Sequence, residues 1–79
     1  PDVTAFDLVL LDPPYDFRDL DGVLAEAAML VMPSGLVVLE HASRREIPED
    51  VAGLTRRRSI KAGDSTLALY RPGPGARQT

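Results

Sequence analysis

An apolar run that stops abruptly at two prolines constrains this chain more than any other feature. Residues 6–11 (Phe-Asp-Leu-Val-Leu-Leu) are apolar apart from Asp7, and Asp12-Pro13-Pro14-Tyr15 follows them directly. Because the run shows no alternation of apolar and polar residues, it is typical of a strand covered on both faces, as in a parallel sheet. In an open α/β sheet, ligands bind at the carboxyl ends of the strands. The sequence therefore predicts that residues 12–15 lie at a ligand-binding edge.

A helix is expected after this turn, over about residues 19–32. Apolar residues recur there at i, i+3, i+4 and i+7, which gives one apolar stripe. Asp19 or Asp21 can cap the start of the helix, where an acidic side chain also suits the helix dipole. Pro33 with Gly35 is expected to end the helix.

Three further strands complete the predicted fold. Residues 36–39 (Leu-Val-Val-Leu) form a second apolar strand, which with the preceding strand and helix predicts a right-handed βαβ unit. Residues 54–62 and 65–70 are strand-like, and Gly63-Asp64 between them indicates an antiparallel hairpin. Residues 42–53 are ambiguous, although Pro48 suits the first position of a short helical turn. The order β-α-β-loop-β-β is that of half a Rossmann-like sheet, an α/β fold.

The domain organisation follows from the length of the chain. Seventy-nine residues allow one small domain, which we place at residues 1–71, and the Pro- and Gly-rich residues 72–79 predict a flexible tail. The first strand looks central by composition, yet nothing in this chain precedes it to pair with its other edge. A bare apolar edge promotes association. We therefore expect the missing half of a longer parent protein, or a second copy of this chain, to cover it.

Composition excludes several classes of protein. The apolar content of 44% is that of an ordinary globular protein rather than of a disordered chain. No apolar run approaches the ~20 residues that a membrane helix needs, and no secretory signal is present. The absence of cysteine excludes disulfides and thiolate zinc sites and is compatible with the cytoplasm. No set of ligand residues suggests a metal, so none is expected.

The net charge of −3 conceals an asymmetry between the two parts of the chain. Residues 1–50 carry eleven acids against three arginines, whereas residues 51–79 carry six cations against Asp64 alone. A basic C-terminal part could contact phosphate, since cationic patches supply the sequence-independent part of nucleic-acid affinity. A solvated strand face explains the same charges more simply. The overall acidity argues against strong nucleic-acid binding by this chain alone.

The chemistry of residues 12–15 suits a planar base that carries an exocyclic amino group. The lone pair of such an amine is delocalised into the ring, and two acceptors on its hydrogens would favour the pyramidal nitrogen that can attack. Asp12 supplies a carboxylate and Pro13 a carbonyl, while Pro14 has no N–H to compete and stiffens the turn. Tyr15 can stack on a base taken out of its helix, which is worth ~1–3 kcal/mol. The alternative is a strand-ending turn with a packed tyrosine.

Residues 6–15 resemble motif IV, the (Asp/Asn)-Pro-Pro-(Tyr/Phe) signature of S-adenosylmethionine-dependent methyltransferases that modify exocyclic amino groups. The turn at residues 32–35, the strand ending at Glu40 and the closing residues 61–70 are similar to the C-terminal part of the RsmD family. Members of that family methylate guanine N2 in bacterial 16S ribosomal RNA. The resemblance covers residues 6–71. It implies the C-terminal half of a Rossmann-like class I methyltransferase sheet, with residues 12–15 as the catalytic motif.

The resemblance also implies what this chain does not contain. Class I methyltransferases hold the cofactor with a Gly-rich loop after their first strand and an acidic residue at the end of the second, and neither is present here. Residues that bind S-adenosylmethionine are therefore expected upstream of Pro1, and this chain alone is expected to be inactive. The implied partner is ribosomal RNA or a small-subunit assembly particle in the cytoplasm, with no membrane involved.

Several further residues are candidates for substrate binding. Phe17 could help Tyr15 to hold the base, although an anchor in the core is the simpler role. Arg44 and Arg45 could contact RNA phosphate from the rim of the site, or belong to a solvated loop. Glu40 and His41 close the second strand and could line the same crevice.

Two alternatives to the ribosomal enzyme stay open at this point. The first keeps the chemistry but changes the substrate, to adenine N6 or cytosine N4 in DNA, because motif IV alone does not separate these amines. The second is a non-catalytic module that docks to RNA or protein by its basic hairpin or its sheet edge. Replacing Arg56, Arg57 and Arg58 should then harm function more than replacing Asp12, whereas the enzyme predicts the reverse.

Overall fold

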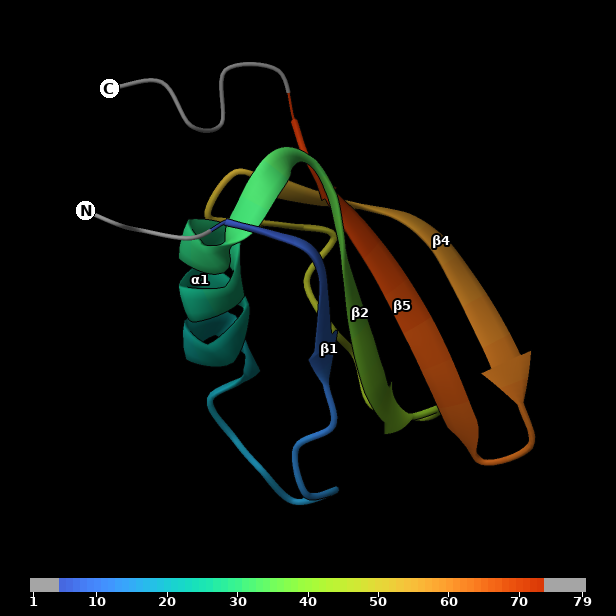
Figure 1. Ribbon diagram of the computed structural model, residues 1–79. Coiled ribbons are helices and arrows are strands. Elements are labelled where there is room, and N and C mark those ends of the chain that lie inside the picture. The colour runs from blue at the N-terminus through green and yellow to red at the C-terminus, as the bar shows by residue number, and fades with distance from the viewer. Residues whose placement is uncertain (1–4, 74–79) are drawn as a thin grey trace.

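The computed structural model describes residues 5–73, which form a single five-stranded sheet and one helix (Figure 1). The elements in chain order are β1 (Phe6–Leu11), α1 (Leu20–Leu30), β2 (Val31–Ala42), β3 (Asp50–Val51), β4 (Leu54–Ala62) and β5 (Ser65–Pro72). The order across the sheet is β1-β2-β5-β4-β3. Only β1 and β2 pair in parallel, and the other pairs are antiparallel. The predicted βαβ unit and hairpin are confirmed, whereas the short strand β3 was not predicted.

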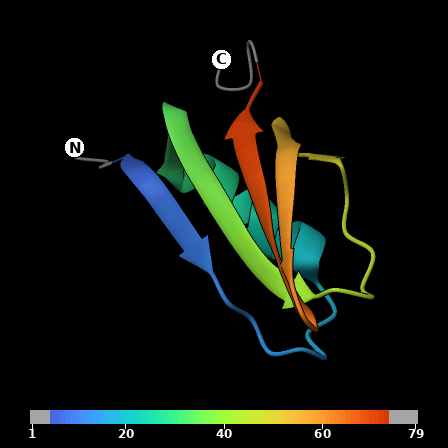
Figure 2. The ribbon, with the colours of Figure 1, turned by 90° about the vertical axis from the view of Figure 1, so that its right-hand side faces the viewer.

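The core lies between α1 and one face of the sheet. Figure 2 shows the helix behind the strands, on one side of the sheet only. Leu24 of the helix is fully buried, as are Val37 and Leu39 of β2 and Tyr70 of β5. Each fully buried aliphatic side chain of this kind contributes about 1.5–3 kcal/mol by leaving water. This small core is what fixes the helix and the loops at its ends relative to the sheet.

The helix begins as predicted and ends earlier than predicted. The Asp19 carboxylate accepts a hydrogen bond from the Gly22 N–H at 3.0 Å and so caps the first turn. The helix ends at Leu30, because Val31 is already extended and pairs with Phe6 as the first residue of β2. The prediction that Pro33 and Gly35 end the helix is therefore wrong, since both lie in β2. Proline disfavours helical backbone at the residue before it, so the helix could not have extended through residue 32.

Gly35 fixes the register of the parallel pair. The pairing of β1 with β2 shifts between Phe6 and Leu8, and Gly35 is buried at this irregularity. A Cβ atom at Gly35 would lie 2.5 Å from Val31 Cγ2 and 2.9 Å from the Asp7 carbonyl oxygen. Only glycine fits without displacing a strand, so the two strands approach each other here because residue 35 has no side chain.

The second face of the sheet is apolar and is covered by no other element of residues 5–73. Leu10 is 69% exposed and Leu8 50%, and both alternate with residues that face the helix. Exposed Ile60 and Leu67 pair with each other on the same face. The prediction that β1 is covered on both faces is therefore not met within the described residues. The strand lies at an edge of the sheet, and its outer side pairs with no described strand (Figure 2).

The segment that returns from β2 to β3 is irregular and is anchored by Tyr70. No helical turn forms after Pro48; instead, the Tyr70 hydroxyl donates a hydrogen bond to the Pro48 carbonyl at 2.6 Å. Two residues beyond Tyr70, Pro72 still belongs to β5, and the Gly73 N–H donates to the Gly53 carbonyl at 2.8 Å. Residues 74–79 of the predicted tail lie outside the described residues. The helix of the described part is too short to cross a membrane.

Replacing Tyr70 with phenylalanine should lower the free energy of unfolding by about 1 kcal/mol, because it removes one hydrogen bond and leaves the Pro48 carbonyl without this donor. Burial raises the pKa of Tyr70 above its ordinary value of 10.0. The unfolded chain therefore loses the phenol proton at a lower pH than the folded chain does. The contribution of the Tyr70 phenol to the free energy of unfolding is complete below its pKa in the unfolded chain. It is lost as pH rises through its pKa in the folded chain.

Urea unfolding at about pH 8 and about pH 11 measures both effects of Tyr70. The wild-type protein should lose more stability between these two conditions than Tyr70→Phe does. An equal loss in both proteins would contradict a stabilising role for the neutral phenol.

Candidate active site

Three segments that are far apart in the sequence meet at one end of the sheet. Because β1 and β2 are parallel, residues 12–15 and residues 43–45 both follow strands that end at the same edge. Strand β5 is antiparallel to β2, and Ala42 pairs with Ser65, so the Gly63-Asp64 turn reaches that edge as well (Figure 1). The predicted motif therefore lies where open α/β sheets bind their ligands.

The motif itself is open to solvent. Asp12 and Tyr15 are exposed and Pro13 is half-buried, and within residues 5–73 no hydrogen bond engages the Asp12 carboxylate. The Phe17 N–H donates to the Pro14 carbonyl at 3.0 Å, which closes a turn directly after the motif. The two prolines leave the start of this turn without N–H donors. The segment thus presents the free carboxylate of Asp12 and the free carbonyl of Pro13 at the tip of β1.

Tyr15 is held in place although its ring is 58% exposed. Its hydroxyl lies 2.6 Å from the Ser65 Oγ, at the start of β5, and either oxygen can donate. This contact joins the motif to the hairpin across fifty positions of sequence. The ring is therefore tied at its hydroxyl end while the residue stays largely exposed, so it can serve as a stacking surface.

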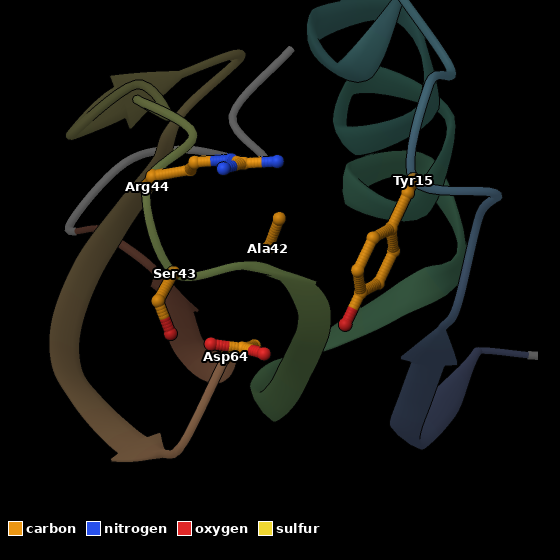
Figure 3. A pocket seen from close by; sticks show the side chains of 5 residues that line it. All are labelled: Tyr15, Ala42, Ser43, Arg44 and Asp64. Carbon is orange, nitrogen blue, oxygen red and sulfur yellow. The ribbon is translucent and has the colours of Figure 1, made fainter.

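A pocket of about 170 Å³ lies beside the Tyr15 ring. Tyr15, Ala42, Ser43, Arg44 and Asp64 line it. In Figure 3 the Arg44 guanidinium and the Asp64 carboxylate lie on opposite sides of this pocket, with the tyrosine ring on a third side.

Ser43 joins the floor of the pocket to the hairpin. Its N–H donates to the Asp64 carbonyl at 2.7 Å, and its hydroxyl donates to the Gly63 carbonyl at 3.2 Å. The same hydroxyl lies 2.7 Å from the Thr66 Oγ1. These contacts fix the Gly63-Asp64 turn against the end of β2. Sequence analysis missed Ser43, Asp64 and Ser65 as site residues, and the Gly-Asp turn signal was the only pointer to them.

The two arginines predicted to contact phosphate occupy different places. Arg44 lines the pocket, and no hydrogen bond or ion pair engages its side chain within the described part of the chain. The Arg45 guanidinium instead donates to the backbone carbonyls of Phe17 and Arg18, the latter at 3.2 Å, with a long contact of 3.5 Å to the Tyr15 carbonyl. Arg45 thus holds the loop that carries the motif.

The remaining predicted candidates lie near the motif in supporting positions. Phe17 packs against the hydrophobic core, which is the simpler of the two roles considered for it. Glu40 and His41 border a small hollow of about 10 Å³ beside the two prolines. The His41 Nδ1 lies 2.8 Å from the Ala42 carbonyl, and its buried Nε2 has no protein partner among residues 5–73. The hollow is about the size that one water needs.

A broader groove continues from the site along the sheet. It has a volume of about 480 Å³ and is bordered by three cations and one acid (Arg45, Arg56, Lys61 and Glu46) together with the hydroxyls of Ser59 and Thr66. Within residues 5–73 no three His, Asp or Glu side chains gather as a metal site requires. The site therefore places hydrogen-bond acceptors, an aromatic ring and cationic side chains beside one pocket.

Comparison with known proteins identifies relatives of this chain. The family described as conserved hypothetical protein 95 matches residues 2–71. The chain is 31% identical over 70 residues to YlbH of Bacillus subtilis (strain 168), which is provisionally named an rRNA methyltransferase, and covers 38% of that protein. A conserved hypothetical protein from Streptococcus pyogenes has a similar structure, with a TM-score of 0.79 and 27% identity over 96% of this chain and 48% of its own.

A third relative is a solved structure that is named an rRNA methyltransferase. The rRNA methyltransferase aviRa from Streptomyces viridochromogenes has a TM-score of 0.64 and 26% identity, over 85% of this chain and 30% of its own. The chain therefore spans less than half the length of each of these three relatives.

Replacing Arg45 with alanine should release the loop after the motif. Hydrogen exchange of the amides of residues 15–19 should accelerate by about tenfold, since the loss of bonds worth about 1–2 kcal/mol lowers the local opening energy by that amount. Arg44→Ala, which removes the neighbouring cation without touching these carbonyls, is the matched control. Equal exchange in the two variants would show that Arg45 does not hold the loop.

Proposed function

Because the chain belongs to the RsmD-like methyltransferase family described as conserved hypothetical protein 95, we propose that it forms the base-binding half of an enzyme that methylates the exocyclic N2 amine of a guanine in 16S ribosomal RNA. One observation supports this most. The free carboxylate of Asp12, the Pro13 carbonyl and the fixed ring of Tyr15 lie together at the carboxyl end of β1, next to a pocket.

Asp12 and Pro13 would orient the amine. The Asp12 carboxylate accepts one N–H of the amine in a charge-assisted hydrogen bond, and the Pro13 carbonyl accepts the other. Held in this way, the nitrogen becomes pyramidal and its lone pair points away from both acceptors toward the methyl donor. Positioning of this kind supplies a large part of the acceleration in reactions between two bound groups. Pro14 contributes by leaving the turn rigid and free of a competing donor.

Tyr15 would bind the base itself. The target guanine leaves its helix and stacks on the tyrosine ring, a contact worth about 1–3 kcal/mol for each base. The bond to Ser65 keeps the ring from rotating away, so the cost of ordering it is already met before RNA binds. Arg45 supports the same geometry from the other side by holding the carbonyls that follow Tyr15.

The described residues do not fit a cofactor site. Within residues 5–73 only β1 leads into a helix, and the loop between them, residues 12–19, contains no glycine that would let a cofactor approach the backbone. S-adenosylmethionine, which would supply an activated methyl group, is therefore proposed to bind chiefly to a part of the protein outside this chain. We propose on the same grounds that the 79-residue chain alone is inactive.

That other part would also cover the bare side of the sheet. Leu8 and Leu10 leave an apolar surface on β1, and its outer edge has unpaired backbone groups in the described structure. Relatives more than twice as long as this chain have room for a second half of the sheet and its helices. We therefore propose that the N-terminal half of the parent protein packs here, with self-association of this chain as the alternative.

Nucleic acid as the substrate class is supported by the cationic groove. Arg56 and Lys61 border it, and it shares Ser43 with the pocket beside Tyr15, so the backbone flanking a flipped base would pass along it. A DNA amino-methyltransferase would use the same motif, so only a methyl-transfer assay with both RNA and DNA distinguishes the two substrates. A docking module without catalysis would instead depend on Arg56, Arg57 and Arg58 and tolerate the loss of Asp12.

Hydrogen exchange tests the proposed covering of β1. The outward amides of residues 7–11 should exchange at least about tenfold more slowly in the full-length protein than in the isolated chain, because a neighbouring strand would pair with them. Light scattering should show that the isolated chain self-associates. A monodisperse monomer with equal exchange rates in both forms would contradict the proposal.

Asp12→Ala tests the proposed activity in the full-length protein. Transfer of a labelled methyl group from S-adenosylmethionine should appear on guanine in unmethylated small-subunit particles, and the variant should lose at least about 10²-fold of it. DNA is offered in parallel, and Glu26→Ala removes an acidic charge from the far surface as a control. Label on DNA alone would show that the proposed ribosomal RNA substrate is wrong. No label on either nucleic acid would favour the docking module.

A further inference from the structure

Two opposite charges face one pocket without pairing. Arg44 and Asp64 line the cavity beside Tyr15, and in the described part of the chain neither side chain forms a hydrogen bond or an ion pair, with the other or with any neighbour. Figure 3 shows the guanidinium and the carboxylate on opposite sides of the cavity, at the edges of the space next to the ring. A planar ligand stacked on Tyr15 would meet a donor on one side and an acceptor on the other.

We propose that Arg44 and Asp64 read the identity of the base that stacks on Tyr15 and select guanine. This inference rests on the proposed function, and it adds to the motif a second set of contacts. Arg44 donates to the O6 and N7 acceptors of guanine, the pairing that arginine makes most often with this base. Asp64 accepts the N1–H, while the neighbouring N2 amine reaches Asp12 and Pro13.

The pair separates guanine from adenine because, of these two bases, only guanine carries this pattern. Adenine has an acceptor at N1, which a carboxylate repels, and an amine at position 6, which a guanidinium repels. A site built to bond a particular donor or acceptor rejects an analogue lacking it, because its own polar groups are then left unpaired. Motif IV holds only an amine, so the motif alone does not supply this choice.

The walls of the pocket are already in place before a base arrives. Ser43 binds the backbone of Gly63 and of Asp64, and this fixes the turn from which the Asp64 side chain projects. Gly63 itself has a φ of 65°, which lets the hairpin turn tightly at this point. Tyr15 is tied to Ser65 on the next strand. Because the ring is tied to the hairpin and Ser43 holds the backbone of the Gly63-Asp64 turn, a base entering the pocket meets a backbone frame that is already ordered.

The size of the pocket agrees with one base. Its volume of about 170 Å³ is roughly a third of that of the neighbouring groove of about 480 Å³, so the pocket suits one base and the groove suits the nucleotides that flank it. Flanking nucleotides would follow the larger cationic groove, which shares Ser43 with the pocket. Arg44 and Asp64 are both exposed at their tips, so a base reaches them without a rearrangement of the fold.

The test uses a base analogue that keeps the N2 amine but lacks the groups that Arg44 and Asp64 are proposed to bind. RNA is synthesised with either guanine or 2-aminopurine at the position that the full-length protein labels. The analogue retains the N2 amine, has no O6 and carries no proton on N1. The wild-type protein should prefer guanine in kcat/KM by about 100-fold or more, and Arg44→Ala and Asp64→Ala should each reduce this preference by about 5- to 100-fold.

Matched variants separate base reading from general effects of charge. Arg57→Ala and Glu26→Ala each remove one exposed charge away from the pocket, and both should keep the wild-type preference. Arg44→Lys keeps the charge but loses the planar fork, so its preference should fall toward that of the alanine variant.

The outcomes are distinct. A preference that stays at the wild-type value in both alanine variants, even with lower rates on both RNAs, overturns this inference and leaves the proposed function intact. Failure of the wild-type protein to label guanine at all overturns the proposed function itself. A reduced preference in both alanine variants with an unchanged preference in the controls supports base reading by Arg44 and Asp64.

Discussion

The parallel pairing of β1 with β2 is the constraint on which the rest of this structure depends. It brings the carboxyl ends of two strands to one edge of the sheet, and it requires the close approach at Gly35 that no other residue allows. α1 crosses back between the strands and buries its apolar stripe against the face they share. The motif after β1 and the loop after β2 are therefore neighbours because of one strand pair.

Contacts from distant parts of the chain then make the motif rigid. Ser65 holds the hydroxyl of Tyr15, and Arg45 holds the carbonyls that follow it. Ser65 begins β5, and Arg45 lies in the loop that Ser43 ties to the Gly63-Asp64 turn, so both contacts depend on how the hairpin packs against β2. The site is therefore a product of the hairpin as much as of the motif, although the two acceptors proposed for the amine come from the motif alone.

The sheet is unequally covered, and this agrees with the length of the relatives. One face carries the helix and the core, whereas the other carries exposed leucines and an unpaired edge in the described structure. A fold this small has little stability to spare, and an open apolar face would cost part of it through association. The N-terminal half proposed for a longer protein would supply cofactor binding and cover this face together.

Local sequence predicted the strands at residues 6–11 and 54–62, the Gly63-Asp64 hairpin and a helix cap at Asp19 or Asp21, because each depends on neighbours within a few positions. It placed the end of the helix wrongly, since the pairing of Val31 with Phe6 outweighed the local signal at Pro33.

The chemistry offered at the tip of β1 was determined by sequence alone, through an acid, two prolines and a tyrosine in a row. Only the tertiary structure decided that Arg45 supports the loop while Arg44 faces the pocket, and that Asp64 joins the site. The direction of a side chain, and its contacts with residues dozens of positions away, depend on strand pairing and packing. No short stretch of sequence determines these.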